Sequence, residues 1–328
     1  MSADPLELPA TPQRVRAIRR NAALPPHLLS RALALAVATP DEDAWHRLLA
    51  LALALLGAGL LLAGVASFIA YNWLRVGRFA KFGGIELAIC VATIIAWRTL
   101  PRFAGQVALA AAAVLVGPLL ALYGQTYETG ADPYGLFLGW LALIVPWVIA
   151  AEFSPLWLFA LFLLDVSVTL YWSQVVQVGY GSDGSNLAVG VINALALVAW
   201  ESQRRLTDRR APRLIALTGF GALLASASDF ALSDNRDVIN VLAVVALAVA
   251  IVSVLLRYRR ISPDRFMVTI AVATGMAWIS IAVGHIVFIT LDFGTTSLLV
   301  MAALVLGEIV LGLRWYRAFS RTLSSRGH

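Results

Sequence analysis

The segment YGQTYETGADPYGLFLGW runs from Tyr123 to Trp140 and concentrates polar, acidic, glycine and aromatic residues between two long apolar runs. The first run covers Phe103 to Leu122, and the second begins within the segment and covers Tyr134 to Ala151. Each run has about the length, roughly 20 helical residues, that crosses a hydrocarbon core of about 30 Å. The segment therefore predicts two membrane-spanning helices joined by a short connection.

Local signals within the segment predict how that connection is built. Asp132 and Pro133 mark a helix start, because Asp accepts hydrogen bonds from free backbone N–H groups and Pro fits the first helical position. Gly124 and Gly130 permit tight backbone, so a short structured loop is expected between them. This loop either turns the chain at a membrane surface with aromatic anchors or lines a binding site. The residues that would line such a site are Gln125, Tyr127, Glu128 and Asp132.

The composition identifies an integral membrane protein. Hydrophobic residues make up 60% of the chain and charged residues 13%, and the mean hydropathy of +0.81 exceeds that of soluble globular proteins. The single cysteine, Cys90, excludes an intramolecular disulfide and a cysteine-based metal site. The sequence also lacks a P-loop, an HExxH zinc motif and a GxSxG nucleophile elbow. We therefore expect no cofactor and no enzymatic activity.

Apolar runs recur along the rest of the chain and predict an all-α, polytopic bundle of about ten spanning helices. Aromatic residues stand at many of their ends, where amphipathic rings prefer the membrane interface. The sixth and seventh runs are the shortest or are interrupted by glycine. The predicted spans are Leu48–Ala70, Phe79–Trp97, Phe103–Leu122, Tyr134–Ala151, Pro155–Trp172, Gly184–Trp200, Ala211–Ser228, Val238–Leu256, Phe266–Thr290 and Thr296–Leu313.

The basic residues predict the orientation of this bundle. If the N-terminus is cytoplasmic and all ten runs span, 21 of the 25 basic residues fall on the cytoplasmic side, as the positive-inside rule requires. Both termini are then cytoplasmic. The exceptions are Arg236 and the basic loop from Arg75 to Lys81, for which snorkelling at a helix end is the available explanation. We interpret the net charge of +6 as a cytoplasmic face that contacts anionic lipids of the bilayer, without nucleic acid.

The chain divides into four predicted regions. Residues 1–24 carry prolines and arginines and predict a flexible cytoplasmic tail. Residues 25–46 predict a short cytoplasmic or interfacial helix, because their apolar residues have helical spacing over too few positions to span. Residues 47–314 form the transmembrane helix bundle, and residues 315–328 a second cytoplasmic tail.

Three motifs carry a family resemblance: SFIAYNW at Ser67–Trp73, GQTYETGADPYGLFLGW at Gly124–Trp140, and the following Pro146-Trp147. Residues 45 to 150 thereby resemble the family called domain of unknown function 2157, whose members are predicted bacterial multi-pass membrane proteins. The resemblance implies a bacterial cytoplasmic (inner) membrane and a shared outer loop. It supplies no catalytic residues, because the family has none assigned.

Polar residues inside the predicted spans are candidates for function, because a charge at the bilayer centre costs about 2.5–3.5 kcal/mol even on insertion scales. Asp165 lies midway along the fifth span without a basic residue in that span. Its carboxyl either handles a proton or cation, or hydrogen-bonds a neighbouring helix. Glu86 and Glu308 lie nearer span ends, where Lys81 or Arg78 and Arg314, respectively, are expected partners. Asn193, in the sixth span, is expected to bond a neighbouring helix.

Three functions fit these features. The first is a transporter or channel-like protein that uses Asp165, with Glu86 as a second candidate group. The second is a non-catalytic membrane sensor, scaffold or assembly factor that uses the outer loop 123–133. The third is a membrane-embedded enzyme acting on lipid-linked substrates, which would need acidic groups paired in space that the sequence does not pair. The small solute or protein partner is not identified by any motif.

Overall fold

A computed structural model describes the chain almost continuously from residue 75 onward. The described ranges are 75–128, 130, 132–176, 184–203, 209–233, 237–260, 262, 264–291 and 294–325, with scattered positions between 28 and 71. The chain forms two units, residues 1–77 and 78–328. The predicted N-terminal tail lies outside the described residues, as do most of the predicted interfacial helix and of the first span, Leu48–Ala70.

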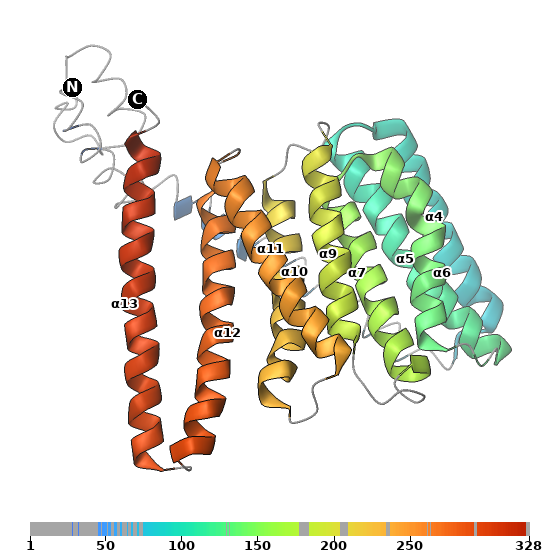
Figure 1. The fold of residues 1–328 in the computed structure, drawn as a ribbon. Helices are drawn as coiled ribbons and strands as arrows, with labels where there is room; N and C mark the ends of the chain where they lie inside the picture. Colours follow the sequence, from blue (N-terminus) through green and yellow to red (C-terminus); the bar gives the residue numbers. More distant parts are fainter. Residues whose placement is uncertain are drawn as a thin grey trace, which may run out of the picture. The chain divides into compact units, whose positions relative to one another are not determined.

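Helices make up the second unit, and no strand occurs among its described residues. Most are apolar around their whole circumference, as expected of helices surrounded by lipid and other helices. Figure 1 shows them side by side, with their axes running in similar or opposite directions. The elements are α4 (Arg78–Thr99), α5 (Phe103–Tyr127), α6 (Pro133–Ala151), α7 (Ser154–Tyr171), the π-helical η1 (Trp172–Val176), α9 (Ser185–Ser202), α10 (Arg210–Leu232), α11 (Val238–Arg260), α12 (Arg265–Leu291) and α13 (Thr295–Ser325).

The all-α polytopic fold is confirmed. By length and composition, nine helices in the described part of the chain can cross a membrane. Each of these helices begins within one residue of the start of the corresponding predicted span, from the span Phe79–Trp97 onward. Most of the helices also end within a few residues of the predicted ends. The sixth and seventh predicted spans, which are short or interrupted by glycine, correspond to α9 and α10, and both helices are long enough to span. At the C-terminal end, α13 continues to Ser325, well into the region predicted as a tail.

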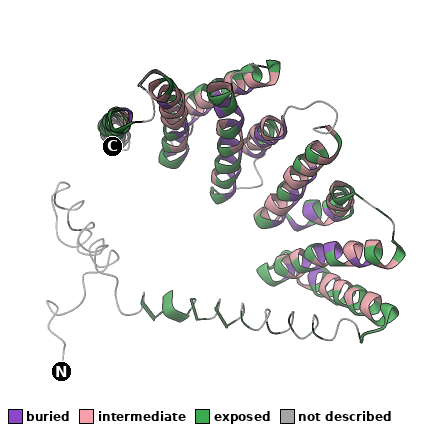
Figure 2. Ribbon diagram, turned by 90° about the horizontal axis from the view of Figure 1, so that it is seen from below, coloured by how far each residue is buried: buried purple, intermediate pink, exposed green. Residues whose placement is uncertain are grey.

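Each helix packs mainly against its neighbours in the chain. Helix α4 packs on α5 and α6 on α7, whereas α10 contacts α9, α11 and α12 and is the most buried of the spans. Figure 2 shows the buried residues where helices face one another and the exposed ones on the outer surfaces. One apolar core joins α4 to α7 around Ile144 and Leu163, and another joins α10 to α12 around Phe220 and Met267.

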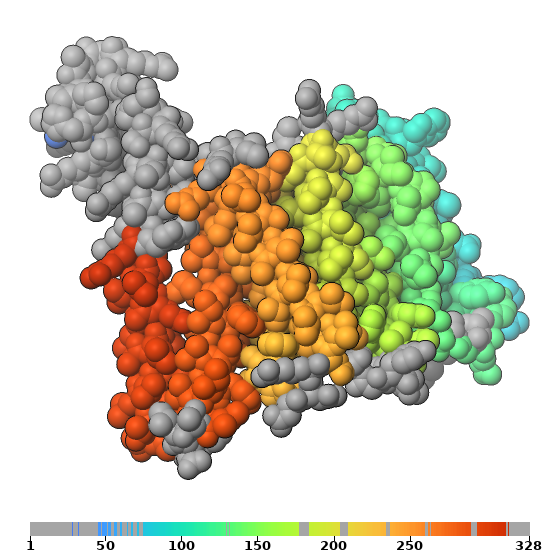
Figure 3. Space-filling view, viewed as in Figure 1, coloured from blue at the N-terminus to red at the C-terminus, as the bar shows by residue number. Residues whose placement is uncertain are grey.

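Helices α9, α10 and α11 pack closely together. Glycines allow α9 and α10 to approach: a Cβ on Gly190 would lie 2.5 Å from the side chain of Leu223. The more limited contact between α9 and α11 lies to one side of α10, and Figure 3 shows α9 in yellow next to α11 in orange. Residues of α10 line the back of a hollow whose other lining residues belong to α9 and α11.

Candidate functional site

Asp165 of α7 and Asn193 of α9 meet at the middle of their spans. The Asn193 amide Nδ2 donates to Asp165 Oδ1 at 3.0 Å and to Oδ2 at 2.9 Å. The same nitrogen donates to the Val189 carbonyl at 3.0 Å, one turn earlier on α9. Two residues that the sequence singled out separately, 28 positions apart, therefore form one polar contact between two helices.

Glycine packing holds Asn193 away from solvent. Asn193 is only 1% exposed. On the neighbouring helix α10, a Cβ on Gly219 would lie 3.0 Å from the Asn193 Cβ, so glycine at this position lets the backbone come close. The interruption at Gly219 that makes the seventh span look weak in the sequence is thus a packing feature. It brings α10 against the Asn193 side chain.

The carboxyl of Asp165 faces neutral groups. Ser167 and Thr169 donate their hydroxyls to backbone carbonyls of α7, at Leu163 and Asp165 respectively, and not to the carboxylate. Within the described ranges, Asp165 takes part in no ion pair. A half-buried carboxyl that meets a neutral amide in a spanning helix is chemically able to hold a proton or a small cation.

The Asn193 amide has an unused acceptor. Its Oδ1 is buried and, among the described residues, receives no hydrogen bond. A carboxylate needs donors, whereas a protonated carboxyl has an O–H that needs an acceptor. Rotation of the amide would present Oδ1 in place of Nδ2 to Asp165. The pair can therefore serve both protonation states of the carboxyl.

The other intramembrane acids stand apart from this pair. Glu86 is exposed on α4, which packs on α5, and the structure does not bring it to Asp165. Glu308 of α13 accepts a hydrogen bond from the Ser280 hydroxyl of α12. The prediction that Arg314 pairs with Glu308 was wrong, because Glu308 forms no ion pair among the described residues. Its partner is the neutral Ser280 hydroxyl of the neighbouring helix.

The outer loop is shorter than the sequence predicts. Helix α5 continues to Tyr127, so Gln125 and Tyr127 lie on its last turn, where the Tyr127 ring meets Phe82 of α4. Glu128 ends the helix in a left-handed conformation at φ 46°, and its N–H donates to the Gly124 carbonyl. Asp132 precedes α6 and Pro133 begins it, as predicted, although the Asp132 side chain makes no capping bond.

Aromatic rings surround this connection. Tyr127 lies 4.8 Å from Tyr123 and 6.3 Å from Phe82 of α4, measured between ring centroids. Tyr134 meets Tyr171 of α7 edge to face at 5.2 Å. Of the four loop candidates, Tyr127 is thus held among other rings, while Glu128 and Asp132 sit in the connection itself.

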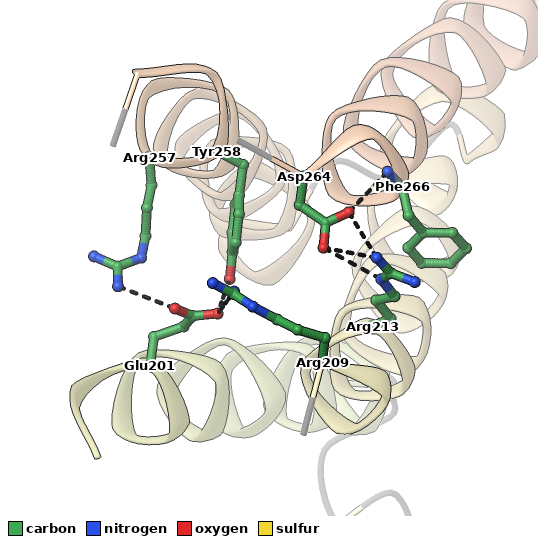
Figure 4. Close-up of polar contacts among 7 residues, drawn as sticks. All are labelled: Glu201, Arg209, Arg213, Arg257, Tyr258, Asp264 and Phe266. Atoms are coloured by element: carbon green, nitrogen blue, oxygen red, sulfur yellow. Dashed lines mark hydrogen bonds and ion pairs between the residues drawn. The ribbon is translucent and has the colours of Figure 1, made fainter. Parts of the chain in front are cut away.

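A second polar group, which the sequence analysis missed, lies at the ends of α9 and α11 (Figure 4). Glu201 Oε1 accepts from the Tyr258 hydroxyl at 2.7 Å and from Arg209 Nη1 at 3.3 Å. Its Oε2 accepts from Arg257 Nη2 at 3.1 Å. We call these four residues the Glu201 cluster. Glu201 is 12% exposed and Tyr258 only 1%, so the cluster ties α9 to α11 from a largely buried position.

Asp264 organises the adjoining helix ends. Its carboxylate receives three bonds of 3.0 to 3.3 Å from the Arg213 guanidinium of α10. Asp264 Oδ1 also accepts from the Phe266 backbone N–H at 2.9 Å, which caps the start of α12. The guanidinium carbon of Arg213 lies 5.5 Å from the centre of the Phe266 ring (Figure 4). Asp264 thus joins α10 to α12.

One sequence signal could have identified these acids. Glu201 and Asp264 are acidic residues beside the arginine-rich segments that follow α9 and α11, where basic residues predominate. Isolated acids in such segments are candidates for ion pairs. The contacts place two predicted cytoplasmic segments, the one between α9 and α10 and the one between α11 and α12, at the same end of these helices, as the predicted alternation requires.

The described residues contain no group of three or more His, Cys, Asp or Glu side chains that could hold a metal ion. Glu201 and Asp264 are each engaged by arginine, and Cys90 is exposed on α4. The expectation that the protein needs no cofactor stays a prediction.

Comparison with known proteins agrees with the membrane fold. Residues 19–157 match the family described as Predicted membrane protein (DUF2157). This confirms the resemblance carried by the Gly124–Trp140 motif, over less than half of the chain. No curated protein and no solved structure matches significantly. The outer loop lies inside the matched residues, whereas Asp165, Asn193 and the Glu201 cluster lie beyond them.

Proposed function

We propose that this protein is a transporter or channel-like protein of a bacterial cytoplasmic membrane in which Asp165 takes up and releases a proton or small cation. The observation that carries the proposal is the contact of Asp165 with Asn193 at mid-span, without a cationic partner among the described residues. Charged side chains within spans are rare and mark ion or proton pathways more often than other positions do.

The chemistry of the pair supports this assignment. In the arrangement observed, Nδ2 donates to both carboxylate oxygens while Oδ1 has no donor among the described residues. Protonation of Asp165 would create the donor that Oδ1 lacks, once the amide turns. The amide therefore offers a binding partner to each form of the carboxyl, which lowers the cost of changing between them.

The orientation in the membrane is part of the same proposal. Arginines at the start of α10 and at the end of α11 gather at one end of the bundle around Glu201 and Asp264. The positive-inside rule assigns that end to the cytoplasm, which also makes both termini cytoplasmic. Anionic lipids are the expected neighbours of this face.

The test of the proposal uses the purified protein in liposomes that contain the pH indicator pyranine. A potassium gradient with valinomycin drives proton entry, and the indicator reports its rate. Asp165→Asn keeps the size of the side chain but removes its titration, so it should abolish any protein-dependent proton flux. Glu308→Gln, which alters an acid elsewhere in the spans, is the matched control and should retain the flux.

A second readout does not depend on a transported substrate. Infrared difference spectra between acid and alkaline buffer should contain a protonated-carboxyl band that disappears in Asp165→Asn and shifts in Asn193→Ala. Identical spectra for the wild type and Asp165→Asn would show that Asp165 does not titrate, and the proposed function would then be abandoned.

A second candidate function is a sensor, scaffold or assembly factor that binds a partner through residues 123–133. Its supporting observation is the group of rings around Tyr127, which is 57% exposed beside the acidic Glu128. A photoreactive benzoyl-phenylalanine at position 127 should then crosslink one protein in cells. The same probe at Phe103, which is exposed at the opposite end of α5, is the control and should not capture that protein.

A further inference from the structure

An apolar hollow of about 300 Å³ opens between α9, α10 and α11. Its size lies at the lower end of the range for ligand pockets, about 300–1,000 Å³. Small side chains leave the space free, among them Ala194 on α9, Gly219 on α10 and Ala250 on α11. Apart from Asn193 and Ser253, every lining residue is apolar. The hollow is therefore suited to a hydrocarbon group.

The hollow is open on the side away from α10. The residues at its back belong to α10 and are buried, with Phe220 at 4% and Leu223 at 2% exposure. The residues at its rim belong to α9 and α11 and are exposed, with Val198 at 68% and Val249 at 58%. Because these helices are spans, the substance at an exposed apolar rim is the lipid of the bilayer.

The hollow leads to the Glu201 cluster along two helices. On α11 the lining residues Ala246, Ala250 and Ser253 follow a helical stripe whose next position is Arg257. On α9 the lining residues Ala194 and Val198 follow a stripe that continues to Glu201. The polar cluster therefore stands at one end of the apolar space, at the end predicted to be cytoplasmic.

The cluster has more positive than negative charge. Glu201 is its only acid, and it faces two arginines, Arg209 and Arg257. Their side chains remain 54% and 42% exposed after these contacts. Within the described residues, Arg257 Nε has no hydrogen-bond acceptor. Guanidinium groups bind phosphate oxygens through several parallel donors, so an anionic phosphate is the complementary group.

We propose that the hollow is a binding site for one anionic phospholipid of the surrounding bilayer. One acyl chain lies between α9 and α11 against Phe220 and Leu223, and the phosphate lies at Arg257 and Arg209. The apolar lining recognises the chain, and the surplus of positive charge at its end selects an anionic headgroup. The site does not involve the titration of Asp165, so it stands independently of the proposed function.

The first test uses the unaltered protein with a photoactivatable phosphatidylglycerol that carries a diazirine on its acyl chain. After irradiation in mixed bilayers, peptide mapping should find labelling concentrated in residues 190–198 and 246–254. Unlabelled phosphatidylglycerol should reduce this labelling more than phosphatidylcholine with the same chains. Labelling spread evenly over exposed positions such as Leu242 and Leu299 would overturn the proposal.

The second test separates the chain from the headgroup. Ala250→Trp fills the hollow and should abolish retention of phosphatidylglycerol in native mass spectra, while Ala248→Trp, which is exposed on the same helix outside the hollow, should not. Arg257→Gln should lower the preference for phosphatidylglycerol over phosphatidylcholine about fivefold, the effect of one basic residue near a membrane surface. Arg259→Gln removes the same charge two residues further along α11, off this stripe, and is the control.

The variants give a clear answer in each case. Equal lipid retention by Ala250→Trp and Ala248→Trp would show that the hollow holds no chain. Equal headgroup preference in Arg257→Gln and Arg259→Gln would show that the positive face acts only as a whole. If Ala250→Trp fails to fold, the photolabelling of the wild type decides the question.

Discussion

Trp140 of α6 lies directly against Gly117 of α5. A Cβ on Gly117 would come within 2.3 Å of the indole ring, closer than any real Cβ contact. The indole Nε1 donates to the Ala113 carbonyl at 2.7 Å, and the ring meets Phe159 of α7 edge to face. Gly117-Pro118 interrupts the pattern of this span in the sequence. The structure explains the glycine as the space that admits Trp140.

Gly117→Ala should therefore destabilise the protein. Forcing a methyl group into this contact is expected to cost about 1–3 kcal/mol, as overpacking of a filled core does. Gly135→Ala on α6 is the control, because nothing lies within 4 Å of its Cβ position, and the better helix propensity of alanine should leave stability unchanged or slightly higher. The measurement is the apparent Tm in detergent by size-exclusion chromatography. Equal Tm losses in the two variants would refute the packing argument.

Trp140→Phe tests the same contact from the other side. It removes the hydrogen bond to Ala113, which should cost about 0.5–1.5 kcal/mol, together with part of the ring contact. The smaller ring also makes room at position 117. Combined with Gly117→Ala, it should restore part of the stability lost by the single glycine variant. Strict additivity of the two changes in Tm would contradict this coupling.

The helix boundaries were predictable because chain length and hydropathy determine them in a membrane. The start of α6 at Pro133 follows from local capping chemistry, as the sequence suggested. The position of Gly124 did not predict the end of α5, because the helix runs through this glycine to Tyr127, whose ring meets Phe82 of α4. A glycine signals a possible turn but does not enforce one.

The candidate site was predictable only in its parts. The rarity of polar residues in spans pointed to Asp165 and Asn193 separately. Their contact depends on the packing of α7 against α9, which no local pattern encodes. Glu201 and Asp264 were missed because they lie at helix ends, where acids are common and usually solvated. Only the fold reveals that arginines from other helices meet them.

Asp165 and Asn193 should be energetically coupled. In a double-mutant cycle of Asp165→Asn and Asn193→Ala, the coupling free energy of unfolding should be about 0.6–1.7 kcal/mol, the range of polar contacts between spanning helices. A cycle of Asp165→Asn with Ser167→Ala is the control, because the Ser167 hydroxyl bonds its own helix at Leu163. Its coupling should be near zero. The cycles are measured by denaturation with a harsh detergent, and similar coupling in both would argue against the pair.

Tyr258→Phe should destabilise the end of the bundle where α9 meets α11. The hydroxyl bonds the Glu201 carboxylate at 2.7 Å, and bonds to charged groups contribute about 1.5–3 kcal/mol. The ring stays in place, so apolar packing is preserved. Tyr171→Phe, in which the ring is 43% exposed, is the control and should change the free energy of unfolding little. A Tm for Tyr258→Phe equal to that of the wild type would show that the buried hydroxyl is satisfied in another way.

Arg213 and Asp264 provide the sharpest test of geometry. Asp264 both pairs with the Arg213 guanidinium and caps α12 through the Phe266 N–H, so its two roles can be separated. Asp264→Asn keeps an oxygen for the cap and loses the charge, whereas Asp264→Ala loses both and should cost about 1 kcal/mol more. Arg213→Lys keeps the charge but cannot reproduce the three hydrogen bonds or the contact with the Phe266 ring, so its stability should resemble that of Arg213→Gln and not that of the wild type.

Hydrogen exchange at the first turn of α12 measures the cap directly: protection there should fall in Asp264→Ala and persist in Arg213→Lys. Persistence in both variants would mean that α12 begins without help from Asp264.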